Sequence, residues 1–380
     1  MRILFLTYCR AVLGANISMI SLIKDLRERY QVESCVVIPD VIDGDLEKIL
    51  IEEEIDYMVH PMKPWVVSEN ASHKILRCIW IYFKNLIYTN SLFKKLKGSK
   101  FQIVYSNNST IQLGSYIAEK MHIPHVWHIR EFGKKDYSII YCCPKWFVRR
   151  RYKKASRVIT ISHELFKEIV REYHLSNAIM IYNGVGMETI AKEKINLDDE
   201  LRFCYVGAIQ SGKNQLELLQ ATKLLIEGNV DNLHIYIVGD GSEYREQLEE
   251  YCKDNGLEKY VTFCGYQSDI PEILRKMDVG VICSNSEAFG RVTCEYMCAS
   301  MPVIGAASGG TVEIIEDGIN GFLYAAGEVQ MLAEKMQLLI KDRKCLKFMS
   351  ENAYQQACSK FTLKKNTDEI YKELCDVIAK

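Results

Sequence analysis

The stretch that most constrains the fold of this chain is SEAFGRVTCEYMCASMPVI, residues Ser286–Ile304. It follows the apolar run Val279–Cys283, which predicts a buried strand, and it begins with a polar loop that contains Glu287. In the next segment, Arg291–Ala299, Glu295 is the only acidic residue among mostly apolar neighbours. A helix that is apolar nearly all round is buried, and a buried carboxylate needs hydrogen-bond donors. We therefore expect Glu295 to be a buried carboxylate that binds ligand hydroxyls.

The start of the same helix predicts a binding site for phosphate. The first backbone N–H groups of a helix have no partner within it, and the helix dipole places positive charge there. Phosphate groups bind at such helix starts. One short element therefore offers a phosphate site next to two carboxylates, Glu287 and Glu295.

The residues around these two carboxylates resemble a known family. Glu287 and Glu295 form the E-x7-E pattern, within Ser-Glu-x-Phe-Gly, of retaining, nucleotide-sugar-dependent glycosyltransferases of family 4, the group 1 type. The resemblance covers nearly the whole chain and is densest over residues 201–324. Further matches follow in the family's order and spacing: Pro302–Ile304, Ser308–Gly310 with Glu313, and Asp317–Leu323.

The length of 380 residues is too great for one hydrophobic core and suits two α/β domains. The resemblance implies the GT-B fold, with two Rossmann-like, doubly wound parallel-sheet domains that face each other across a cleft. We expect an acceptor-binding domain over residues 1–187 and a nucleotide-sugar-binding domain over residues 188–360, with the polar stretch Lys192–Glu200 as the linker. The last helix, residues 361–380, is expected to cross back to the first domain.

The family's site residues can be carried over position by position. Gly14 matches a glycine near the donor phosphates, and Lys213 matches the lysine that binds the diphosphate. The loop Gly265–Tyr266 resembles the segment that contacts the base. His128 matches the histidine that faces the transferred sugar, so it is predicted to be catalytic together with Glu287. The remaining predicted donor-binding residues lie in the central stretch: Phe289, Gly290, Arg291, Val292, Thr293 and Glu295.

The sequence departs from the family at Ala208, where an arginine is usual. We hypothesise that Arg291, next to the predicted phosphate site, takes over part of that contact with the diphosphate. No cofactor or metal is expected, because Lys213 and the helix start supply positive charge. Asp43-Gly44-Asp45 could be read as a D-x-D metal motif, but it opens a charged helix and a turn is the better interpretation.

Charge is unevenly distributed along the chain. Residues 1–190 contain 27 Lys and Arg against 19 Asp and Glu, whereas the rest contains 21 against 30. Much of the basic excess lies in residues 73–100 and 145–157, where it is mixed with aromatic residues. Such segments suit an anionic membrane surface, a solvated helix face or a nucleic-acid patch, and the first of these is the predicted partner.

The predicted location is cytoplasmic, with peripheral contact at the inner face of the plasma membrane. The opening MRILFLTYC is interpreted as a first buried strand and not as a secretory signal. No apolar run approaches the length of a membrane-spanning helix. The 14 cysteines are scattered and form no CxxC pair, which favours reduced thiols over disulfides or a zinc site.

These features predict an enzyme that transfers a hexosyl or N-acetylhexosaminyl residue, with retention, from a nucleoside-diphosphate sugar. The predicted acceptor is a lipid-linked glycan in bacterial surface polysaccharide biosynthesis. Two alternatives stay open: a non-catalytic module that binds nucleotide sugars or a membrane surface, and a GT-B-like phosphorylase or epimerase. The sugar, the base, the acceptor linkage and the oligomeric state do not follow from the sequence.

Overall fold

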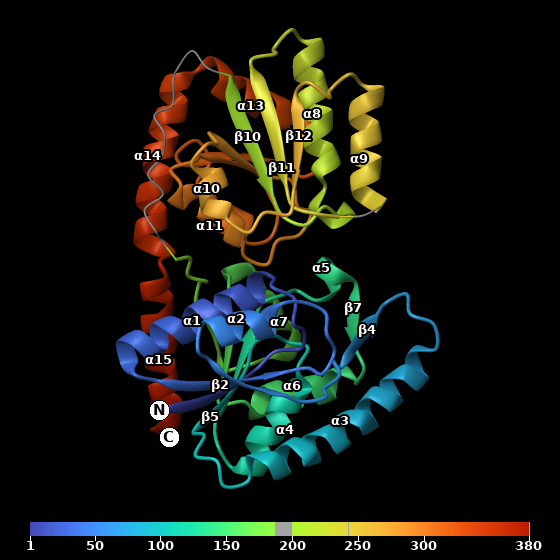
Figure 1. Ribbon diagram of the computed structural model, residues 1–380, viewed down its shortest axis with the longest axis vertical. Coiled ribbons are helices and arrows are strands. Elements are labelled where there is room, and N and C mark those ends of the chain that lie inside the picture. The colour runs from blue at the N-terminus through green and yellow to red at the C-terminus, as the bar shows by residue number, and fades with distance from the viewer. Residues whose placement is uncertain (187–199, 242, 380) are drawn as a thin grey trace. The chain divides into compact units, whose positions relative to one another are not determined.

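A computed structural model describes residues 1–186, 200–241 and 243–379 of the chain. The chain divides into two compact units, which are described separately (Figure 1). Unit 1 comprises Met1–Gly184 with Leu363–Lys380, and unit 2 comprises Val185–Thr362. The expected linker falls outside the described residues except for Glu200, and the domain boundaries expected from the sequence stay predictions.

Unit 1 is built on a seven-stranded sheet in the order β3-β2-β1-β5-β6-β8-β9, in which all neighbouring strands are parallel. A separate antiparallel pair joins β4 to β7. The strands are β1 (Arg2–Leu6), β2 (Glu33–Ile38), β3 (Asp56–Val59), β4 (Val66–Ser68), β5 (Ile103–Ser106), β6 (His125–Ile129), β7 (Ile139–Tyr141), β8 (Arg157–Thr160) and β9 (Ala178–Met180).

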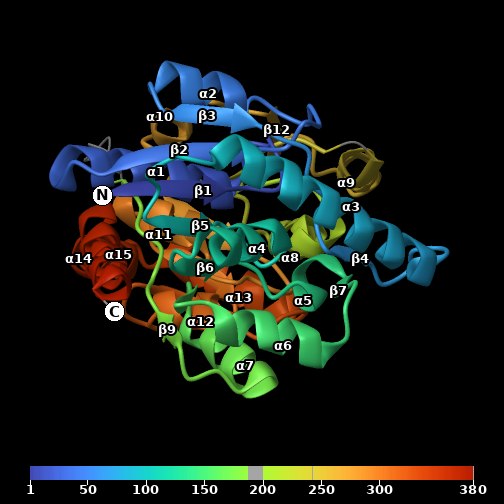
Figure 2. The same ribbon diagram turned by 90° about the horizontal axis from the view of Figure 1, so that it is seen from below.

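Helices cover both faces of this sheet (Figures 1 and 2). They are α1 (Gly14–Tyr30), α2 (Leu46–Glu52), α3 (Lys74–Leu96), α4 (Gln112–Met121), α5 (Lys134–Tyr137), α6 (Lys145–Lys154), α7 (His163–Tyr173) and α15 (Leu363–Ile378). Consecutive residues of β1, such as Leu4 and Phe5, are both fully buried and belong to different apolar clusters. Burial on both faces is why such strands are apolar runs without alternation.

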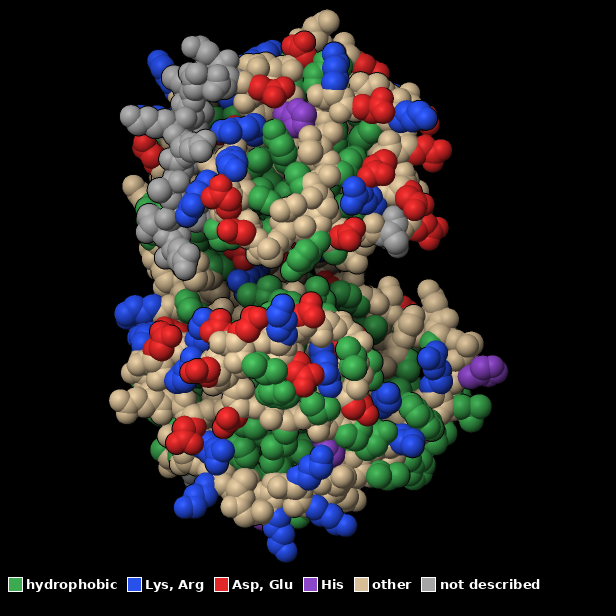
Figure 3. Space-filling view, viewed as in Figure 1, with side chains coloured by type: hydrophobic (Ala, Val, Ile, Leu, Met, Phe, Trp, Pro, Cys, Tyr) green, Lys and Arg blue, Asp and Glu red, His purple; other side chains and the backbone are tan. Residues whose placement is uncertain are grey.

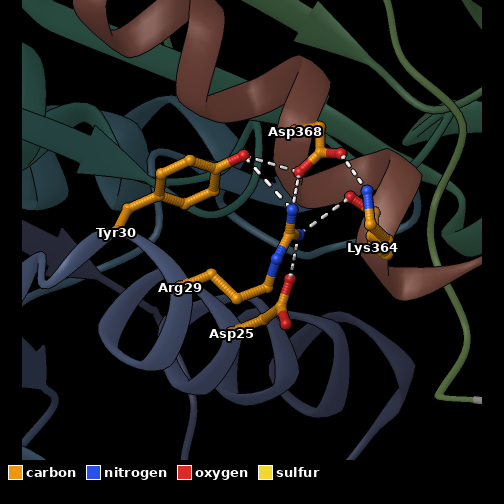
Figure 4. A network of polar contacts seen from close by, with 5 residues as sticks. All are labelled: Asp25, Arg29, Tyr30, Lys364 and Asp368. Atoms are coloured by element: carbon orange, nitrogen blue, oxygen red, sulfur yellow. Dashed lines mark hydrogen bonds and ion pairs between the residues drawn. The ribbon is translucent and has the colours of Figure 1, made fainter.

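The C-terminal helix α15 packs against α1 within unit 1 and is held there by a polar network (Figure 4). The carboxylate of Asp368 accepts a hydrogen bond from the Tyr30 hydroxyl at 2.6 Å, and it also pairs with Arg29 and with Lys364. Asp25, one helical turn before Arg29, binds the same guanidinium at 3.0 Å. The last 18 residues of the chain are therefore part of the first unit.

Unit 2 contains a six-stranded parallel sheet in the order β12-β11-β10-β13-β14-β15. Its strands are β10 (Leu201–Val206), β11 (Leu233–Val238), β12 (Val261–Gly265), β13 (Val279–Ile282), β14 (Val303–Ala306) and β15 (Gly321–Tyr324). Its helices are the 3₁₀ turn η1 (Ser211–Lys213), α8 (Gln215–Glu227), α9 (Glu243–Asp254), α10 (Ile270–Leu274), α11 (Arg291–Cys298), α12 (Thr311–Ile314), α13 (Val329–Lys341) and α14 (Arg343–Lys360). Among the described residues, no helix is both long enough and apolar enough to cross a bilayer.

Candidate active site

The strand order of the unit 2 sheet reverses between β10 and β13, which are neighbours. From β10 the chain proceeds to β11 on one side, and from β13 it proceeds to β14 on the other. Ligands of open parallel sheets bind beyond the carboxyl ends of the strands at such a point. The loop after β10 carries Lys213, and the loop after β13 carries Glu287. Two residues predicted from the family resemblance therefore lie at the place in the sheet where ligands bind.

Lys213 and Glu287 form an ion pair in the structure. The Nζ atom of Lys213 lies 2.8 Å from Oε2 of Glu287, and the two side chains are 29% and 19% exposed. The Tyr205 hydroxyl donates to the backbone carbonyl of Lys213 at 2.6 Å, which fixes the start of the lysine side chain. Both charges are partly open to solvent, so a ligand can compete for either of them.

A turn rich in small residues holds the backbone of Glu287. The Gly310 N–H donates to the carbonyl oxygen of Glu287 at 2.6 Å, and the Ser308 hydroxyl donates to the carbonyl of Ser284 at 2.7 Å. Gly309 has a φ of +49°, and a Cβ atom there would lie 2.1 Å from the same carbonyl oxygen of Glu287. Only glycine allows this close approach. The turn 308–310 therefore positions the carboxylate-bearing loop.

Helix α11 begins directly after this loop. Gly290 is its N-terminal cap residue, with a φ of +100°, and within the described chain no side chain caps the helix start. The preceding Phe289 is buried, and its ring packs at 5.9 Å, edge to face, against Phe361 of the same unit. The Phe289 side chain thus anchors the helix start, which leaves the backbone N–H groups of the first turn as the groups suited to phosphate.

The first turn of α11 also contains Val292 and Thr293. Val292 is partly exposed, whereas Thr293 is fully buried. The Oγ1 atom of Thr293 has no hydrogen-bond partner among the described residues. A buried hydroxyl without a partner is uncommon in folded proteins.

The prediction of a buried Glu295 is wrong. Its side chain is 25% exposed, and its Oε1 atom accepts a hydrogen bond from Nε of Arg291 at 2.7 Å. Arg291, Val292 and Glu295 stand at positions i, i+1 and i+4, so they share one face of α11, and this face is the less buried one. The opposite face, with Thr293 and Tyr296, is buried. The carboxylate is accommodated by an ion pair and solvent, without any need for a ligand hydroxyl.

Gly265 and Tyr266 lie at the carboxyl end of β12, in the same unit. The Gly265 carbonyl accepts a hydrogen bond from the Gly239 N–H at 2.9 Å, and Gly239 in turn packs on Gly207, where a Cβ would lie 2.0 Å from the Gly207 carbonyl oxygen. The loops after β10, β11 and β12 are thereby tied together. Tyr266 is 71% exposed, so its ring is available for stacking.

His128, in unit 1, is fully buried at the end of β6. Its Nδ1 atom lies 2.6 Å from the Tyr105 hydroxyl and 3.2 Å from Nη2 of Arg130. A guanidinium only donates hydrogen bonds, so Nδ1 accepts and the ring proton is assigned to Nε2. That Nε2 atom has no partner among the described residues. Burial, reinforced by the Arg130 charge, holds the pKa of His128 well below its usual range, so the ring is neutral at pH 7.

The other predicted residue of unit 1, Gly14, begins α1 and is exposed. It is linked to His128 through a short network. Nε of Arg130 donates to Oδ1 of Asn107 at 2.9 Å, and Nδ2 of Asn107 donates to the carbonyl of Ala15 at 3.0 Å. β1 and β5 are neighbours at which the strand order of the unit 1 sheet reverses, so this network also lies at a switch point.

Sequence reasoning missed the residues that surround these side chains. Tyr105, Asn107 and Arg130 all stand at or just after the ends of strands β5 and β6. Polar residues directly after an apolar run could have identified them, because the carboxyl end of a parallel strand is where ligands bind. Asn183, which accepts from Nη1 of Arg130 at 2.6 Å, lies beyond β9 and gave the same signal.

Two family models match the chain almost end to end. "Glycosyltransferase Family 4" matches residues 14–189, and "Glycosyl transferases group 1" matches residues 186–356. The second match contains Lys213, Glu287 and all of α11. The first contains Gly14 and His128.

Curated relatives and solved structures agree with these matches. The chain is 26% identical over 309 residues to UDP-Gal:alpha-D-GlcNAc-diphosphoundecaprenol alpha-1,3-galactosyltransferase of Escherichia coli, covering 76% of this chain and 79% of that protein. It is 25% identical to N-acetyl-alpha-D-glucosaminyl L-malate synthase of Bacillus anthracis, covering 66% and 68%. The structure of Anabaena HepE in complex with UDP and glucose superposes with a TM-score of 0.80 at 22% identity, covering 99% of each chain.

Proposed function

The chain belongs to the group 1 glycosyltransferases of family 4 and has their GT-B fold, and we propose that it transfers a hexosyl or N-acetylhexosaminyl residue from a UDP-sugar to a lipid-linked glycan. Glycosyl transfer itself follows from the family. The choice of UDP is supported by the Escherichia coli relative, named for UDP-Gal, and by the UDP bound in HepE. The sugar class and the acceptor are proposals that the tests below address.

The observation that carries the proposal is the Lys213–Glu287 ion pair at the switch point of the unit 2 sheet, next to the uncapped start of α11. A diphosphate offers Lys213 a stronger set of charge-assisted hydrogen bonds than one carboxylate oxygen does. We propose that donor binding draws Lys213 onto the diphosphate and releases Glu287 to accept hydrogen bonds from hydroxyls of the donor sugar.

The start of α11 would hold the rest of the diphosphate. In this proposal the N–H groups of Val292 and Thr293 donate to phosphate oxygens and stabilise the negative charge that develops on the leaving group. Glu295 accepts hydrogen bonds from the ribose hydroxyls, and Arg291 keeps that carboxylate in place through the 2.7 Å contact. Because the positive charge comes from the protein, the proposal includes no resident metal ion.

Unit 1 contributes two further groups to the proposal. His128 is assigned to the transferred sugar because it matches the family's histidine that faces that sugar, and its Nε2 carries a proton and lacks a partner among the described side chains. A neutral histidine can donate a hydrogen bond to a sugar hydroxyl without being a general acid. Gly14 is assigned to the donor phosphates because it matches the family's glycine near those phosphates, and it is exposed at the start of α1.

The reaction is proposed to retain the anomeric configuration. The acceptor hydroxyl would form its bond to the anomeric carbon on the same face from which the diphosphate leaves. The acceptor proton would pass to a departing phosphate oxygen, so that the products are the glycoside and UDP. A lipid-linked acceptor of bacterial surface polysaccharide assembly is supported by the Escherichia coli relative, whose name contains diphosphoundecaprenol.

A thermal-shift screen against UDP, GDP and ADP, followed by UDP-sugars, tests the donor. A ligand at about 100 times its dissociation constant stabilises the folded state by roughly 2.7 kcal/mol, which is a clear shift in melting temperature. We expect UDP to raise the melting temperature more than GDP or ADP. Equal shifts with the three nucleotides would contradict the assignment of UDP.

Transfer is tested with the preferred UDP-sugar and a diphosphoundecaprenol-linked N-acetylhexosamine, with Glu287→Gln as the site variant. The matched control is Glu258→Gln, an exposed glutamate of the same unit. Glu287→Gln should lower turnover at least about 100-fold while still binding UDP, and the control should behave as the wild type. The anomeric coupling constant of the product, measured by NMR, gives the stereochemistry, and an inverted product would refute retention.

The same assays separate the alternatives. A binding module would bind UDP and release no sugar. A phosphorylase would require inorganic phosphate for turnover, and an epimerase would change the donor sugar in the absence of acceptor.

A further inference from the structure

Helix α3 presents large apolar side chains to solvent, and it buries polar side chains together with apolar ones. Asn85 and Thr89 are buried on the side that faces the rest of unit 1, where Asn85 exchanges hydrogen bonds of 2.9 and 3.1 Å with the backbone of Lys63. The exposed apolar side chains of the helix are 49–77% accessible: Ile75, Leu76, Ile79, Trp80, Phe83 and Ile87. Ile81, Leu92 and Leu96 are buried as well, so α3 carries apolar residues on both its buried and its exposed sides, unlike a helix that packs only against its own domain.

The exposed side chains form one continuous stripe. Ile75, Ile79, Phe83 and Ile87 are spaced four residues apart, so they lie on one side of the helix. This side is opposite the one that carries the buried Ile81 and Asn85. At 1.5 Å per residue the stripe is about 18 Å long. A contiguous apolar surface of this size on a soluble domain indicates an interaction surface.

Basic residues accompany the stripe. Residues 70–118 contain no Asp or Glu, and α3 carries Lys74, Arg77, Lys84, Lys94 and Lys95. Within the described parts of the chain none of these five side chains takes part in an ion pair. Figure 3 shows hydrophobic and basic side chains intermingled at the lower right of the molecule, where α3 runs in Figure 1. The surface therefore combines apolar area with uncompensated positive charge.

The second basic segment, residues 145–157, is less suited to the same role. Arg151 is buried, donates to the Ser115 hydroxyl at 2.8 Å and pairs with Glu119 at 2.7 Å, and Lys154 pairs with the same carboxylate at 2.7 Å. Lys145 pairs with Glu172 at 3.4 Å. The prediction that this segment as a whole meets the membrane is wrong for Arg151, because its guanidinium joins α6 to α4 inside unit 1.

We propose that the exposed face of α3 docks on an anionic lipid surface. The apolar stripe enters the boundary between headgroups and acyl chains, and the lysines and Arg77 of the same helix contact the lipid phosphates. Charge complementarity selects this partner: a helix with apolar residues on one side, cations at its margins and no acidic residue has the features of a helix that lies in the membrane interface. The inference concerns unit 1 alone and does not depend on the donor chemistry.

Vesicle flotation with the full-length chain tests the inference. The vesicles contain either phosphatidylcholine alone or phosphatidylcholine with about one third phosphatidylglycerol. We expect the protein to float with the anionic vesicles only, and the bound fraction to fall when salt rises from about 0.1 to 0.5 M. Ile79→Ser with Phe83→Ser should weaken binding about ten-fold, because both side chains leave the lipid for water. Lys94→Gln with Lys95→Gln should weaken binding to anionic vesicles and reduce its salt dependence.

Matched controls separate this face from general surface chemistry. Ile42→Ser with Ile51→Ser removes two other exposed isoleucines of unit 1, and Lys344→Gln with Lys347→Gln removes two exposed lysines of unit 2. Both control variants should float as the wild type does. Donor binding, measured by the UDP thermal shift, should be unchanged in all of these variants, so a loss of flotation is distinguishable from a failure of the proposed function.

Three results would overturn the inference. The wild type could fail to float with anionic vesicles, or the α3 variants could float as well as the wild type. The third is a dimer, seen by light scattering, that the Ile79→Ser and Phe83→Ser changes dissociate in a protein that does not bind vesicles. That outcome would assign the face to a second copy of the chain.

Discussion

Alanine at Gly309 should displace the loop that carries Glu287. Gly309 has a φ of +49°, a conformation that costs an L-residue about 1 kcal/mol. The added Cβ would lie 2.1 Å from the Glu287 carbonyl oxygen, and that overlap is relieved only if the loop moves by about 1 Å. Overpacking of this kind costs about 1–3 kcal/mol, so the total destabilisation should be about 2–4 kcal/mol.

Gly318→Ala is the matched control. Gly318 lies in the same unit and has a φ of +80°, but an added Cβ would meet nothing within 4 Å. It therefore introduces the conformational cost without the overlap. Calorimetry of the full chain should show a melting temperature roughly 2–12 °C lower for Gly309→Ala than for Gly318→Ala, given about 2–4 °C per kcal/mol for a unit of this size.

The functional effect should be larger than the loss of stability suggests. A displacement of about 1 Å in a catalytic group can lower turnover about 100-fold. Transfer from the preferred UDP-sugar, measured below the melting transition, should fall by that factor in Gly309→Ala and remain near the wild-type value in Gly318→Ala. If both variants melted together and turned over equally, the turn 308–310 would not position Glu287, and the reasoning would fail.

Three further predictions concern single side chains. Lys213→Met should lower turnover about 100- to 1,000-fold and weaken UDP binding measured by calorimetry, since it removes the proposed diphosphate contact, and unchanged UDP binding would contradict that role. Arg291→Ala should raise the KM for the donor, whether Arg291 contacts the diphosphate in place of an arginine at Ala208 or holds Glu295 as it does in the structure, and an unchanged KM and kcat would exclude both roles. Burial lowers the pKa of His125 to about 3 and that of His128 well below 6.5, so both stay neutral in the folded state, and stability should fall as pH drops below about 6.5. When the pH is lowered from 7.5 to 5.5, each of the two histidines should lower the free energy of unfolding, measured with urea, by about 1.4 kcal/mol. His128→Gln should remove one of these two contributions.

Sequence reasoning predicted the architecture well because it depends on strong, local signals. The strand predicted over Val279–Cys283 ends one residue earlier in β13, and the first buried strand predicted in the opening residues is β1, Arg2–Leu6. The loop with Glu287 was found because it follows an apolar run at the carboxyl end of a parallel strand. Such signals require no knowledge of distant neighbours.

The environment of individual side chains was harder to predict. Glu295 was expected to be buried because its neighbours are apolar, but α11 has only eight residues, and its less buried face holds Arg291 four positions earlier. The contact of His128 with Tyr105 joins residues 23 positions apart, and no local pattern reveals it. The sequence of α3 contains apolar and basic residues but does not indicate which side of the helix is buried. In the structure the polar Asn85 is buried and the apolar Phe83 is exposed.

Two ion pairs of unit 2 explain how the two carboxylates of the E-x7-E pattern can lie next to a predicted phosphate site without repelling the phosphate. Each carboxylate has a cation of its own, Glu287 with Lys213 and Glu295 with Arg291, so the two pairs together carry no net charge. A carboxylate without a neighbouring cation would repel a diphosphate. In an ion pair, the positive charge of the cation offsets this repulsion. In the proposed donor complex, Lys213 exchanges the Glu287 carboxylate for the diphosphate. The strength of that contact is limited by partial exposure, which keeps the exchange within reach of an ordinary ligand.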